Sequence, residues 1–76
     1  MNKQLIAYRK ALNISQTQIA KEIGMCLTTY NQKEIGRRDF TQKEMSSILS
    51  IIKKYNPNAT IDEIFFSSEV NILITN

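Results

Sequence analysis

The sequence predicts an all-α fold, a compact bundle of five helices over about residues 3–66. Helix starts are marked by the spacing of a capping box, a Ser or Thr followed three residues later by Glu or Gln. These pairs are Ser15 with Gln18, Thr41 with Glu44, and Thr60 with Glu63. Each pair opens a stretch in which apolar residues recur at helical spacing, so the three helix starts support one another.

Length and composition allow one domain, which we expect over residues 1–67, followed by a tail over 68–76. A chain of 76 residues cannot bury two cores. Its 42% apolar and 22% charged residues are typical of a soluble globular protein. No apolar run approaches the roughly 18 residues that span a bilayer. The N-terminal stretch lacks a signal-peptide core, and the single Cys26 excludes an internal disulfide framework. We therefore expect a cytoplasmic protein without a membrane partner.

The first two helices are predicted over residues 3–12 and directly after Ser15. In the first, one stripe at helical spacing holds four residues: Leu5, Ile6, Arg9 and Leu12. In the second, an apolar face holds Ile19, Ala20 and Ile23. Gly24 then fits a helix stop in the left-handed backbone conformation.

The remaining helices are predicted over 27–34, from Thr41 to about residue 55, and over 61–66. Gly36 ends the first of these, and a polar loop leads to Phe40. The long helix carries five apolar residues at helical spacing: Met45, Ile48, Leu49, Ile51 and Ile52. It stops before Asn56-Pro57, because a residue that precedes proline disfavours the helical conformation.

The tail changes period. Val70, Ile72 and Ile74 alternate with other residues over 69–75, which predicts a short C-terminal strand. A lone strand needs a partner edge, and two tails pairing as an antiparallel ribbon would supply one in a symmetric homodimer. The alternative is an unstructured C-terminal end.

Residues 16–35 match a helix-turn-helix, in which two short helices meet at a tight turn and the second enters the DNA major groove. Ala20 is the small residue expected where the helices cross, and Gly24 supplies the turn. Four apolar residues are expected to lock the two helices together: Ile19, Ile23, Met25 and Tyr30.

These residues resemble the phage-repressor and Cro-like helix-turn-helix regulators. The resemblance is carried by Ile14-Ser15-Gln16, Ile19-Ala20, Ile23-Gly24-Met25 and Glu34-x-Gly36, and residues 60–66 are similar to the family's closing helix. It implies a lambda-repressor-like helical domain that binds operator DNA, usually as a dimer.

One face of the second helix is the candidate for reading bases. Helical spacing places five residues on this face, away from Tyr30: Leu27, Thr28, Asn31, Gln32 and Ile35. The resemblance implies base contacts at Leu27, Thr28 and Gln32. Gln32 and Asn31 can each pair with an adenine edge, while Leu27 and the Thr28 methyl suit thymine methyls. The alternative, a solvated polar face, leaves Leu27 and Ile35 exposed without a role.

Charge favours an anionic partner. Residues 1–43 hold eight Lys or Arg against three acids, whereas residues 44–76 hold two against four. Candidate contacts to the DNA backbone are Gln16, at a helix start, and three basic residues near the second helix: Arg37, Arg38 and Lys43. The alternative is that these are solvated surface charges.

Three further charged residues are expected to contribute to the packing of the second helix: Arg9, Glu34 and Lys33. The resemblance implies a structural ion pair between Arg9 and Glu34, whereas two unrelated surface charges are the alternative. Lys33 occupies a position where the family usually keeps an apolar residue. We expect its stem to cover the core and its ammonium to reach solvent or a phosphate.

The sequence therefore predicts a sequence-specific DNA-binding regulator, a phage or prophage Cro-like repressor that reads a palindromic operator as a homodimer. A protein-interaction module, such as an antitoxin on the same fold, is the alternative, with the tail 69–75 as its binding element. An enzyme is not expected, because the chain has no histidine and no nucleophile–base or metal constellation. No cofactor, metal or small-molecule substrate is expected.

Overall fold

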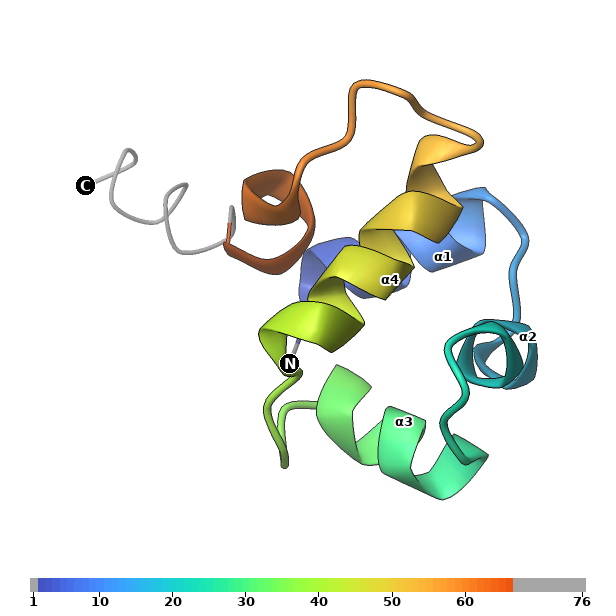
Figure 1. Ribbon diagram of the computed structural model, residues 1–76, viewed down its shortest axis with the longest axis vertical. Coiled ribbons are helices and arrows are strands. Elements are labelled where there is room, and N and C mark those ends of the chain that lie inside the picture. Colours follow the sequence, from blue (N-terminus) through green and yellow to red (C-terminus); the bar gives the residue numbers. More distant parts are fainter. Residues whose placement is uncertain (1, 67–76) are drawn as a thin grey trace.

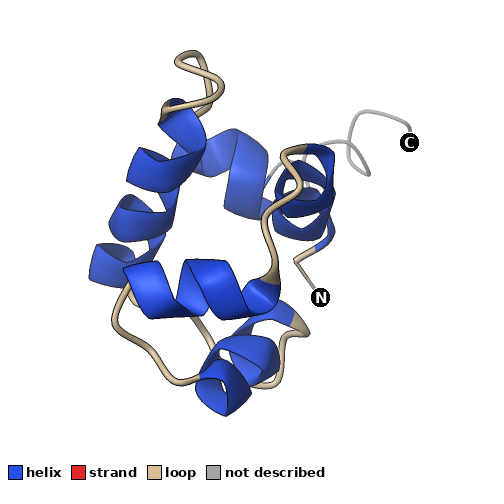
Figure 2. Cartoon of the chain, turned by 90° about the vertical axis from the view of Figure 1, so that its right-hand side faces the viewer, coloured by secondary structure: helices blue, strands red, loops and turns tan. Residues whose placement is uncertain are grey.

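A computed structural model describes residues 2–66, which form five helices packed into one bundle (Figure 1). The elements are α1 (Lys3–Ala11), α2 (Gln16–Glu22), α3 (Leu27–Glu34), α4 (Gln42–Lys53) and the short π-helix η1 (Asp62–Phe66). Between residues 2 and 66 there is no strand (Figure 2). The predicted all-α class with five helices is confirmed. The strand predicted over 69–75 lies outside the described residues.

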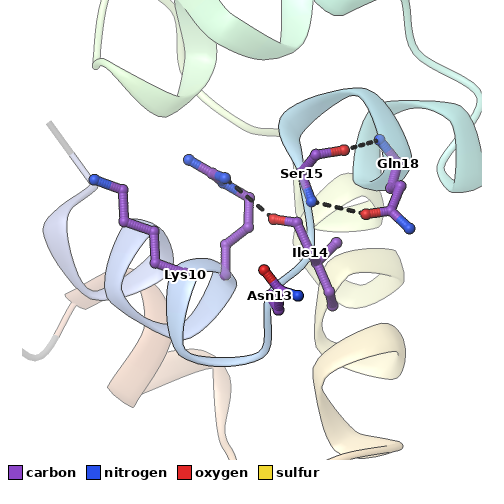
Figure 3. A pocket seen from close by; sticks show the side chains of 6 residues that line it. Lys10, Asn13, Ile14, Ser15 and Gln18 are labelled. Carbon is purple, nitrogen blue, oxygen red and sulfur yellow. Dashed lines mark hydrogen bonds between the residues drawn. The ribbon is translucent and has the colours of Figure 1, made fainter.

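The predicted helix starts are present as hydrogen bonds. Ser15 Oγ accepts the Gln18 N–H at 3.1 Å, and Gln18 Oε1 accepts the Ser15 N–H at 2.9 Å (Figure 3). Thr41 and Glu44 form the same reciprocal box at the start of α4. At the last start, Thr60 Oγ1 accepts the Glu63 N–H at 3.2 Å. Each bond satisfies an amide that the first helical turn leaves without a partner.

The turns after α2 and α3 use glycine as predicted. Gly24 has φ +72° and Gly36 has φ +93°, a conformation in which a Cβ is unfavourable. The turn at Gly24 is closed by the Met25 N–H, which donates to the Ala20 carbonyl at 2.9 Å. This tight connection sets α3 directly against α2.

The core takes residues from all five helices and from the segment before η1. Its nine buried hydrophobic residues are Leu5, Ile19, Ala20, Tyr30, Ile48, Ile51, Ile52, Ala59 and Ile64. Ile23 and Met25 pack against this cluster, which confirms the predicted lock between α2 and α3. The Phe40 ring lies 5.9 Å from the Tyr30 ring and 5.6 Å from the Phe65 ring, centroid to centroid. The inner face of α3 is thereby fixed.

The end of α4 and the form of the last helix differ from expectation. The helix α4 ends at Lys53. The turn after it is closed by the Tyr55 and Asn56 amides, which both donate to the Ile52 carbonyl. The last element forms a π-helix rather than an α-helix. None of the helices described here has the length and apolar character needed to cross a bilayer.

Candidate nucleic-acid interface

The helix α3 lies at one end of the molecule with α2 against it (Figure 1). Its inner side holds Tyr30, which is fully buried. On its outer side, Leu27 is 45% exposed and Thr28 is also exposed. Gln32, one turn after Thr28, is half-buried. The outer face therefore combines methyl groups with a side-chain amide, a set that can contact base edges in a major groove.

The two candidate amides on α3 are placed differently. The Asn31 Nδ2 donates to Gln16 Oε1 at 3.3 Å, so this amide is engaged with α2. The Gln32 backbone carbonyl accepts the Arg37 and Arg38 amides at 2.9 and 3.3 Å. These two bonds use the backbone of Gln32 and do not engage its side chain.

A hydrogen-bonded network centred on Glu34 orients α3. Arg9 Nε lies 3.0 Å from Glu34 Oε2, and Arg9 Nη2 donates to Oε1 at 3.1 Å. The Tyr30 hydroxyl donates to Oε2 at 2.6 Å, and Gln16 Nε2 donates to Oε1 at 2.7 Å. Glu34 is 1% exposed. The expected partners Arg9 and Glu34 are thus brought together, and one buried carboxylate joins α1, α2 and α3.

The protonation states in this network follow from its geometry. Burial by itself would raise the pKa of Glu34, but hydrogen bonds from Arg9, Tyr30 and Gln16 outweigh burial and lower that pKa. The bond to Glu34 raises the pKa of Arg9, and burial raises the pKa of Tyr30. At neutral pH the network therefore holds one cation, one anion and a neutral phenol, and its hydrogen bonds are satisfied.

Sequence reasoning did not identify two parts of this network. It treated Tyr30 only as an apolar lock, although its hydroxyl is a donor to Glu34. It also overlooked Asn2, whose N–H donates to the Glu34 carbonyl at 3.0 Å and whose Nδ2 donates to the Lys33 carbonyl at 2.9 Å. Asn2 lies more than 30 residues away in the sequence, and no local pattern signals such a C-terminal cap.

Lys33 is buried on α3, but its ammonium does not reach solvent as expected. The ammonium pairs with a carboxylate, since Nζ lies 2.6 Å from Oε1 and 2.8 Å from Oε2 of Glu44. Lys33 is only 7% exposed. A buried ammonium needs a counter-charge, and the capping carboxylate at the start of α4 supplies it.

The candidate backbone contacts divide into two groups. Arg37, Arg38 and Lys43 are exposed, the first two in the turn after α3 and the last in the first turn of α4. Gln16 instead has both ends of its amide directed at α3, through Glu34 and Asn31. It braces α3 in this structure, and its amide nitrogen carries two hydrogens, one of which is used by Glu34.

Two short helices joined by a glycine turn, with the inner face of the second fixed and its outer face exposed, define a helix-turn-helix DNA-binding domain. Comparison with protein families agrees, since the family described as "Helix-turn-helix" matches residues 5–56. The chain belongs to this family, of the phage-repressor and Cro-like type, a family of DNA-binding domains rather than enzymes. Searches of the curated proteins and of the solved structures give no significant match.

Proposed function

We propose that the protein is a sequence-specific transcriptional repressor of the kind that phages and prophages encode, acting in the cytoplasm. In this proposal α3 is the recognition helix and lies in the major groove. The observation that carries it is the outer face of α3, where Leu27 and Thr28 are exposed on a helix that the Glu34 network joins to α1 and α2. Rigid presentation of such a face is what base reading requires.

Base contacts are assigned to Leu27, Thr28 and Gln32, with Asn31 contributing if its amide leaves Gln16. Backbone contacts are assigned to Arg37, Arg38 and Lys43, because these side chains are exposed beside the end of α3. Gln16 is assigned a phosphate contact through the second hydrogen of its amide nitrogen. Contacts to phosphates would add affinity and fix the register, whereas the α3 contacts would set sequence preference.

Selection of binding sites from random double-stranded DNA, followed by gel-shift titration, tests this function. We expect a defined site that competes far better than scrambled DNA of the same length. Binding that is equal for all sequences, or no binding, contradicts the proposal. The alternative is a protein-interaction module on the same fold, and co-purification of a second protein would favour it. Its expected binding element, residues 69–75, lies outside the described residues.

Replacing Arg38 by Ala should weaken binding to every sequence by a similar factor. A phosphate contact carries no sequence information, so preference for the selected site over scrambled DNA should be retained. The slope of log affinity against log salt concentration should fall in magnitude by about one. The exposed Lys53, at the end of α4, gives a matched control, because Lys53→Ala removes the same charge farther along the chain. A change of preference in Arg38→Ala would assign this residue to the bases instead.

We also propose that the protein binds a palindromic operator as a homodimer. Two recognition helices would then lie about 34 Å apart, one turn of DNA. Deletion of residues 68–76 should leave the helical fold intact and give a monomer with much weaker operator binding. Sedimentation and gel-shift titration check this. If the shortened protein sediments and binds like the full chain, the tail does not form the dimer, and α4 becomes the next candidate interface.

A further inference from the structure

A second ion pair joins the recognition helix to the start of α4. Both oxygens of Glu44 lie within 2.8 Å of Lys33 Nζ. The Lys33 side chain is 8% exposed and that of Glu44 is 24% exposed. Glu44 Oε1 also accepts the Thr41 N–H at 2.8 Å. One carboxylate therefore caps α4 and holds the last turn of α3.

Stability alone does not explain a lysine at this position. Withdrawing an ammonium from water is costly, and an apolar side chain of similar volume is often at least as stabilising in such a place. An ion pair differs from apolar packing in being directional, because the ammonium hydrogens point at two defined oxygens. The pair therefore fixes the start of α4, and the loop before it, relative to α3 along a defined direction.

The loop that carries Arg37 and Arg38 runs between the two paired residues. Its first part is held on α3, because both arginine amides donate to the Gln32 carbonyl. Its last part is held by the Phe40 ring, which packs against Tyr30. The Lys33–Glu44 pair closes the base of this loop, so the exposed arginines project from a segment that is fastened at both ends.

We infer that Lys33 and Glu44 are positioning residues for DNA binding. They set where Arg37 and Arg38 meet the sugar–phosphate backbone while the outer face of α3 reads the bases. The pair itself does not contact DNA, because its charges are mutually neutralised and mostly buried. This inference rests on the proposed function and adds to it a role for a buried pair outside the Glu34 network.

The test uses the opposite charges of the two residues. Affinity for the site selected from random DNA is measured for Lys33→Met and Glu44→Gln at several salt concentrations. An effect of net charge alone would weaken binding in Lys33→Met and strengthen it in Glu44→Gln. Positioning predicts that both variants bind roughly tenfold more weakly and that the salt slope falls by about one to two in each. Preference for the selected site over scrambled DNA should stay unchanged.

Two controls separate positioning from loss of fold or charge. Glu22→Gln removes the same charge from an exposed residue of α2 and should not weaken binding. Gln is accepted at the capping position of Glu44, so the start of α4 should persist, as circular dichroism can check. If Lys33→Met fails to fold, the double variant Lys33→Met/Glu44→Gln carries no unpaired charge, and it should also bind about tenfold more weakly.

The outcomes distinguish this inference from the proposed function. If the wild-type protein selects no site from random DNA, both are wrong. If the wild type selects a site and Glu44→Gln or the double variant binds it as tightly as the wild type, the positioning role alone is overturned. Weaker binding in both pair variants, with a smaller salt slope and unchanged preference, supports the inference.

Discussion

Replacing Glu34 by Ala should destabilise the fold by about 3–5 kcal/mol. The substitution removes the acceptor shared by Arg9, Tyr30 and Gln16 and leaves a guanidinium that is 11% exposed without its counter-charge. A domain of this size is stable by roughly 5–15 kcal/mol in total, so much of its stability would be lost. Thermal and urea unfolding followed by circular dichroism measure the change.

Two variants show whether the unpaired charge is the cause. Glu22→Ala removes an exposed carboxylate and should leave the free energy of unfolding within about 0.5 kcal/mol of the wild type. Adding Arg9→Met to Glu34→Ala removes the stranded cation and should restore part of the stability. A melting temperature unchanged by Glu34→Ala would mean that the network does not hold α3.

The same carboxylate should make the wild-type protein sensitive to acid. Because the pKa of Glu34 is lower in the folded protein than in the unfolded chain, its stabilising contribution is complete above the unfolded value, about 4.3. As the pH falls below that value and through the folded pKa, the contribution is lost. Urea unfolding between pH 7 and pH 3 should show this decline, and the decline should be smaller in the Arg9→Met/Glu34→Ala variant.

Replacing Gln32 by Ala should weaken binding to the selected site by about 1–3 kcal/mol and relax the preference at one base pair. A glutamine amide can donate to and accept from an adenine edge, and alanine can do neither. Alanine favours helix formation, and the Gln32 backbone carbonyl that holds Arg37 remains, so α3 should stay intact.

Gln4→Ala, on α1, is the matched control and should bind like the wild type. Competition gel shifts with sites altered one base pair at a time measure the preference of each variant. If Gln32→Ala weakened binding to selected and scrambled DNA equally, Gln32 would contact the sugar–phosphate backbone of the DNA rather than the bases. Unchanged binding to both would show that the assigned face of α3 is wrong.

Local sequence signals predicted most of the fold because each acts over a few residues. The reciprocal bonds of Ser15 with Gln18, and the positive φ of Gly24, follow from chemistry within one helical turn. The end of α4 was predicted about two residues too late, since Pro57 sets only the last position that the helix can reach and not where it ends. The π-helical form of η1 has no comparable local signal.

The side-chain interactions that position the site were less predictable, because they join residues distant in sequence. The Arg9–Glu34 contact was expected through a family resemblance rather than from spacing. The contacts of Asn2 and Lys33 were missed or placed wrongly, since each depends on how α3 packs against other segments. A lysine on a buried face indicates that a partner is needed without indicating which carboxylate provides it.

The claim that the outer face of α3 reads DNA is tested most directly by NMR titration of the ¹⁵N-labelled full chain with the selected duplex. We expect the largest chemical-shift changes on the amides of residues 27–32 and on the Gln32 side-chain amide. A scrambled duplex should shift mainly Arg37, Arg38 and their neighbours. Changes centred on α1 or η1, or the same pattern with both duplexes, would contradict it.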